Sequence, residues 1–202
     1  MSRAHALELV LDPEDDARVR ARWAALEDAG VASLARHLGT THRPHLTVAS
    51  SPRRPDEQVL ALAAEQWGAL LPLQLDVTGL VLLGGRRLTI ADLVAAPLAA
   101  RRAQAEVVLG WPGADERPWV PHVSLATRLT VEGASTALAA LSSATQGRGD
   151  VDGGRGDVPD TRGGGLSGWG AGSGAGPTLT VRALRWWDPE AEAVSDVAVS
   201  AA

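Results

Sequence analysis

Two short motifs in this sequence place a hydroxyl residue two positions after a histidine. The first motif is His45-Leu46-Thr47-Val48, and the second is His122-Val123-Ser124-Leu125. An imidazole can take or give a proton near neutral pH, and a hydroxyl can donate a hydrogen bond to developing negative charge. One histidine acting as a base and another as an acid is what in-line displacement at phosphorus needs. The paired motifs therefore predict phosphoryl chemistry.

Each motif is predicted to lie on a β-strand. Apolar residues alternate with the histidine and the hydroxyl residue, and a proline precedes each run, as is common at the first residue of a strand. Because successive strand side chains point to opposite faces, His45 and Thr47 share one face, about 6 to 7 Å apart. His122 and Ser124 follow the same rule. We expect the two strands to face each other across a groove.

The composition narrows the class of protein. The 202 residues are 45% hydrophobic, which favours a globular protein, and no apolar run is long enough to span a membrane. We expect no signal peptide and a cytoplasmic location. Cysteine is absent, which excludes disulfides, thiolate catalysis and cysteine-bound zinc. The net charge of -5 argues against a broad nucleic-acid-binding surface, and the absence of lysine rules out a Walker-type phosphate loop.

The rest of the chain supplies elements that can position these motifs. Hydrophobic periodicity and turn residues predict further strands and helices in two similar halves. We predict further strands at 4–11, 73–83, 87–94, 178–187 and 193–201. Helices are predicted at 13–28, from 56 through 67 with Pro72 marking the end, at 98–109, and from 130 or 132 to about 144. A short strand or helical turn is predicted within 31–38. This order predicts an α+β fold.

One segment lacks the residues needed for a core. Residues 146–177 are dominated by glycine and contain almost no aliphatic side chains. Burial there cannot offset the entropy of ordering the chain, so we predict a disordered insertion. A glycine pattern at 163–168 formally fits a dinucleotide fingerprint, but no strand precedes it and no helix follows it.

At these residues the chain resembles the two-histidine phosphoesterase superfamily, which is defined by a pair of His-apolar-Thr/Ser-apolar motifs. The surrounding residues Arg43-Pro44-His45 and Trp119-Val120-Pro121-His122 resemble the bacterial 2'-5' RNA ligase and RNA 2',3'-cyclic phosphodiesterase family. The resemblance covers nearly the whole chain in element order, except the glycine-rich segment. Ser124 stands where threonine is commoner in the family.

The resemblance implies one bilobal domain over residues 1–202. Its two pseudo-symmetric lobes would each hold an antiparallel sheet with helices on the outer face, around a central groove. It also implies hydrolysis of a 2',3'-cyclic phosphate to the 2'-phosphate, with 2'-5' RNA ligation as the reverse reaction. We favour His45 as the acid and His122 as the base, with Thr47 and Ser124 binding the phosphate.

Three more residues are candidates for substrate contact. Arg43 and Arg128 lie just outside the motifs and can reach a phosphate, although a solvated arginine at a strand end is an equal alternative. Trp119 is the candidate for stacking on a base, with a core or rim position as its alternative. Glu8 can face the groove from the first strand, but we expect it to be solvated.

We expect no metal and no cofactor. His42 and His45 differ by three positions, so on one continuous strand they point to opposite faces and do not share a metal. The expected partner is an RNA terminus or a small cyclic nucleotide, bound by a monomer without a membrane. Two alternatives remain, a phosphodiesterase of a non-RNA cyclic phosphate and a non-catalytic RNA- or nucleotide-binding module.

Overall fold

The computed structural model describes residues 4–37, 39, 41–146 and 177–200. The predicted insertion 146–177 lies outside the described residues, apart from its first and last positions. The strands are β1 (His5–Leu11), β2 (His45–Ser51), β3 (Leu73–Gly84), β4 (Leu88–Ala95), β5 (His122–Leu129), β6 (Thr178–Asp188) and β7 (Ala193–Val199). The helices are α1 (Pro13–Asp28), α2 (Glu57–Gly68), α3 (Leu98–Gly110) and α4 (Val131–Gln146), with a short 3-10 helix at Leu34–Arg36.

The strands form one antiparallel sheet in the order β2-β1-β6-β3-β4-β5, with β7 paired to β6. Strand β6 is the centre of this sheet, because its first residues pair with β3 and its later residues pair with β1 and β7. The two motif strands, β2 and β5, lie at opposite ends of the order. They nevertheless contact each other, because the sheet curves back on itself.

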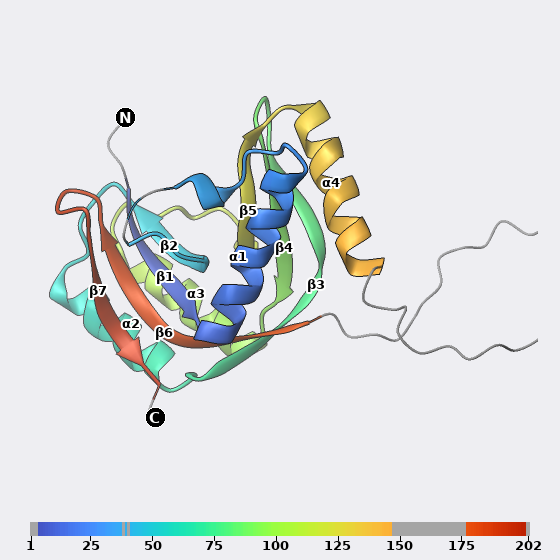
Figure 1. Ribbon diagram of the computed structural model, residues 1–202. Helices are drawn as coiled ribbons and strands as arrows, with labels where there is room; N and C mark the ends of the chain where they lie inside the picture. Colours follow the sequence, from blue (N-terminus) through green and yellow to red (C-terminus); the bar gives the residue numbers. More distant parts are fainter. Residues whose placement is uncertain (1–3, 38, 40, 147–176, 201–202) are drawn as a thin grey trace, which may run out of the picture.

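The helices pack in two pairs. Helices α1 and α4 contact each other and cover β4 and β5, whereas α2 and α3 contact each other and cover β7, β6 and β2 (Figure 1). Helix α1 begins after Asp12, whose carboxylate accepts a 2.8 Å hydrogen bond from the Asp15 amide. Asp56 caps α2 in the same way through the Val59 amide, 2.9 Å away. Aspartate is favoured at this position because it satisfies amides that have no partner within the helix.

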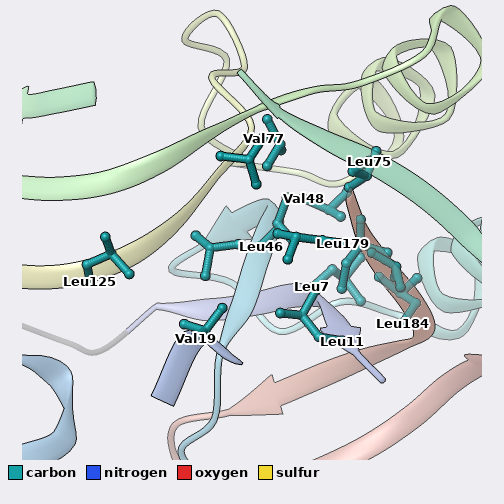
Figure 2. Close-up of a cluster of buried hydrophobic side chains, with 14 of the residues drawn as sticks. Leu7, Leu11, Val19, Leu46, Val48, Leu75, Val77, Leu125, Leu179 and Leu184 are labelled. Atoms are coloured by element: carbon teal, nitrogen blue, oxygen red, sulfur yellow. The ribbon is translucent and has the colours of Figure 1, made fainter. Parts of the chain in front are cut away.

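The core fixes the orientation of the motif strands. Leu46 and Val48 of β2 are buried among aliphatic side chains of β1 and β6, and Leu125 of β5 belongs to the same cluster (Figure 2). Val123 is also fully buried. Because alternate residues of a strand point to opposite faces, burial of these aliphatics turns the histidines and hydroxyls of both motifs away from the core.

The α+β class predicted from the sequence is confirmed, and so is the antiparallel arrangement of the strands. The ambiguous stretch at 31–38 contains the short 3-10 helix. Pairing of β3 with β6 joins the strands of the two halves into one sheet. Among the described helices, none combines the length and the apolar character needed to cross a membrane.

Candidate active site

The two motif histidines have the same local geometry. The Nδ1 atom of His45 lies 2.7 Å from the carbonyl oxygen of Arg43, and Nδ1 of His122 lies 2.7 Å from the carbonyl oxygen of Val120. A carbonyl oxygen can only accept, so Nδ1 carries the proton in each ring. Each histidine is therefore held by the backbone two residues before it, with Nε2 left for proton transfer.

The hydroxyl residues accompany the histidines as the alternation predicts. Thr47 and Ser124 are partly exposed, while their neighbours Leu46, Val48, Val123 and Leu125 are buried. In the described part of the chain neither hydroxyl makes a hydrogen bond to another group of the protein. Both hydroxyls are thus available as donors to a ligand beside the histidines.

Side chains of the opposite half hold each motif strand in place. The Nε1 atom of Trp119, just before β5, donates a 2.9 Å hydrogen bond to the carbonyl oxygen of Thr47 on β2. On the other side, Nε1 of Trp23 on α1 donates to the carbonyl oxygen of Ser124 on β5, 3.1 Å away. Both indoles satisfy carbonyls of strands at the ends of the sheet, where ladder partners are missing on one side.

A cleft with a volume of about 560 Å³ opens beside His45. Strands β1 and β6 contribute Glu8, Arg185 and Trp187 to its lining, and Arg128 contributes from β5. Arg128 has a left-handed backbone with φ 60°, next to a shift in the β4–β5 register. An irregularity of this kind changes the direction of a side chain on a strand, which explains how Arg128 reaches the cleft.

Glu8 lies buried in the wall of this cleft. It is only 7% exposed, so the expectation of a solvated carboxylate is wrong. Its Oε2 accepts a 2.9 Å hydrogen bond from Nε of Arg185 and forms an ion pair with Nη2 of the same guanidinium, 2.8 Å away. Its Oε1 lies 3.5 Å from Nε2 of His45. The register of β1 explains this placement, because Glu8 pairs with Thr47 on one side and with Arg185 on the other.

His37 and His42 also line the cleft, and their rings belong to an aromatic stack. The ring of His42 lies 4.2 Å from that of His37 and 5.4 Å from that of Trp23, and it meets His45 edge-on at 6.3 Å. Burial lowers the pKa of His42 from 6.5 to about 4, and the positive charges of His37 and His45 add to this effect. His42 therefore stays neutral near pH 7 and packs as an aromatic ring.

The other predicted contact residues lie elsewhere. Arg43 donates from Nε to Asp16, 3.1 Å away, and does not line the cleft. Trp119 meets the ring of Trp67 edge-on at 6.4 Å and is partly buried. His122 also lies outside the lining of this cleft, on the strand that contacts β2. Trp187 does line the cleft.

Comparisons with known proteins show a fold similar to that of solved structures. No protein-family model and no curated protein sequence matches the chain. Usb1 of Kluyveromyces marxianus superposes with a TM-score of 0.53, at 11% identity, over 97% of this chain and 98% of that chain. The structure of the same protein with uridine monophosphate gives a TM-score of 0.52, at 12% identity, over 98% and 99%. At such identities the likeness shows a shared fold.

Proposed function

We propose that this protein is a phosphodiesterase that hydrolyses 2',3'-cyclic phosphate ends of RNA or nucleotides to 2'-phosphates without a catalytic metal. The observation that carries the proposal is the matched pair of histidines on β2 and β5, each anchored through Nδ1 to a backbone carbonyl. The fold shared with a protein whose structure holds uridine monophosphate supports a nucleotide substrate. We place the whole reaction in one bilobal domain acting as a monomer.

The surroundings of the two histidines assign their roles. Nδ1 of His45 donates to a carbonyl, and Oε1 of the Glu8 carboxylate lies 3.5 Å from Nε2. His45 is then the acid. Among the described residues no carboxylate lies within 4.0 Å of His122, whose Nε2 is left with its lone pair. His122 is then the base.

In this mechanism Nε2 of His122 takes a proton from water as its oxygen attacks phosphorus. The bond from phosphorus to the 3' oxygen breaks, and that oxygen takes the proton from Nε2 of His45, which leaves a 2'-phosphate. The hydroxyls of Thr47 and Ser124 donate to the non-bridging oxygens, where negative charge builds. With an RNA 5'-hydroxyl in place of water as the nucleophile, the same proton transfers form a 2'-5' phosphodiester and release the 3' oxygen, so ligase activity uses the same two histidines.

The cleft favours a short substrate. Arg185 is one of the cations of the cleft, but its guanidinium is already hydrogen-bonded and ion-paired to Glu8. A protein with a net charge of -5 also attracts long RNA weakly. A nucleotide or a small cyclic phosphate is thus favoured over a long strand. A shallow dependence of kcat/KM on salt would agree with this, because each phosphate contact adds to the slope.

The test is product analysis after incubation with a nucleoside 2',3'-cyclic phosphate in the presence of a chelator. We expect a 2'-phosphate product from the wild type, and losses of several orders of magnitude in His45→Ala and His122→Ala. Circular dichroism should show that both variants fold. No product with intact nucleotide binding would favour a binding module, and no product without binding would point to a different phosphodiester.

A further inference from the structure

A group of side chains that could bind a metal ion lies far from the histidine pair. His5 begins β1 and Asp188 ends β6, and they are neighbours because Ala6 pairs with Trp187. Strand β1 places His45 beside Val10, at its other end. Five residues of extended chain span about 17 Å, so this group is separate from the candidate active site.

The imidazole of His5 is buried without a hydrogen bond at one nitrogen. His5 is 2% exposed, and its Nδ1 atom has no hydrogen-bond partner in the described structure. The nearest carboxylate oxygen, Oδ1 of Asp188, is 3.8 Å away, which is too far for a hydrogen bond. A buried polar atom without a partner is costly and is an indication of a missing ligand.

Glu190 supplies a third ligand atom. One atom each from His5, Asp188 and Glu190 lie within 4.8 Å of one another. Glu190 is exposed in the turn between β6 and β7, so its side chain can adjust. Metal–ligand distances of about 2.0 to 2.2 Å are typical for zinc with nitrogen and oxygen ligands, and a small inward shift of Glu190 would bring the group towards that spacing.

A cationic side chain of the protein competes with a metal ion for the carboxylate of Asp188. Its Oδ1 accepts hydrogen bonds from the amides of Glu190 at 2.9 Å and Ala191 at 3.3 Å, which hold the turn against the carboxylate. Its Oδ2 lies 3.6 Å from Nη1 of Arg54. The Arg54 guanidinium also lies over the ring of Trp186, 4.6 Å from its centroid. Arg54 is thus the cation that a metal ion would displace from Asp188.

We propose that His5, Asp188 and Glu190 bind one divalent transition-metal ion, with zinc as the best match to one imidazole and two carboxylates. The ion joins the start of β1 to the turn between β6 and β7, and it stabilises the fold without taking part in the reaction. The proposal does not depend on the proposed function, because the ligands lie at the opposite end of β1 from His45.

The test is a titration of the full chain with zinc chloride, followed by calorimetry and by the thermal midpoint of unfolding. We expect one zinc ion per chain and a midpoint that rises with zinc, because an ion that binds only the folded state stabilises it. Glu190→Gln should weaken binding by about tenfold or more. Arg54→Gln should strengthen binding, because it removes the competing cation.

Three controls keep the test decisive. His5→Gln should abolish binding, and the exposed Glu190→Gln variant gives the same information if His5→Gln fails to fold. His37→Gln should bind zinc like the wild type, because it removes an exposed histidine outside the site. Turnover should not change on adding zinc. No binding at 100-fold excess zinc, or equal binding by the wild type and Glu190→Gln, would overturn the proposal.

Discussion

The indole N–H of Trp23 on α1 donates a 3.1 Å hydrogen bond to the carbonyl oxygen of Ser124 on β5. Helix α1 precedes the first motif in the chain, yet it supports the second. Helix α3 precedes the second motif and supports the first, because Nε2 of Gln104 donates to the carbonyl oxygen of Val48, 3.3 Å away. Each motif strand is therefore held by a helix from the other half of the chain.

Trp23→Phe should destabilise the protein more than Trp67→Phe. Both indoles are buried, but Nε1 of Trp67 has no hydrogen-bond partner in the described structure, whereas Nε1 of Trp23 bonds Ser124. Loss of that bond leaves the carbonyl unpaired and should cost about 1 to 3 kcal/mol. Urea unfolding of the two variants measures the difference, and equal losses would show that the Trp23 bond contributes nothing.

Glu8→Ala should destabilise the fold by about 3 to 5 kcal/mol, because it leaves the buried Arg185 guanidinium without its partner. The double variant Glu8→Leu with Arg185→Met should recover most of this loss, since it removes both charges. Catalysis should stay impaired in both proteins, because His45 has lost the carboxylate beside Nε2. Denaturant unfolding and kcat separate the two effects, and a fully active double variant would contradict the role of Glu8.

The stability of the fold should fall as the pH drops from about 6.5 to about 4, partly because of His42. Its pKa is 6.5 when unconstrained and about 4 in the fold, so the unfolded chain binds the proton more readily. Stability therefore rises with pH across this window and is fully present above it. His42→Phe keeps a ring against Trp23 and should flatten the profile. Urea midpoints at several pH values test this, and an unchanged slope would refute it.

Trp187 and Trp119 are the two candidates for stacking on a base, and we expect their substitutions to have different effects. Trp187 lines the cleft, whereas Trp119 uses its indole N–H to hold β2. Stacking contributes about 1 to 3 kcal/mol per base, so Trp187→Leu should raise KM by about 5- to 150-fold with little loss of stability. Trp119→Leu should instead lower stability. The opposite pattern in steady-state kinetics and thermal unfolding would return the stacking role to Trp119.

Much of the fold is encoded in local patterns that can be read without the structure. Strand alternation placed His45, Thr47, His122 and Ser124 on partly exposed faces, and the helix starts predicted at 13 and 56 lie within one residue of the starts of α1 and α2. These features depend on residues close together in the chain. The boundaries between strands and helices could therefore be predicted wherever a turn residue or a helix-starting residue marks them.

The surroundings of the site could not be predicted in the same way. Glu8 and Arg185 are 177 positions apart, and only the pairing of β1 with β6 brings them together. A single glutamate in an apolar strand is compatible with solvent exposure as well as with burial beside a cation. The stack of His37, His42 and Trp23 likewise depends on how the segment before β2 folds over α1.

The central position of β6 has a consequence for the order in which the fold can form. The sheet order separates β1 and β2 from β3, β4 and β5, and β6 is the strand that joins the two groups. Because β6 follows all of these strands in the sequence, a growing chain can form both groups but cannot join them into one hydrogen-bonded sheet until residues 178–188 emerge. The continuous sheet that carries both histidines is thus among the last features of the protein to be completed.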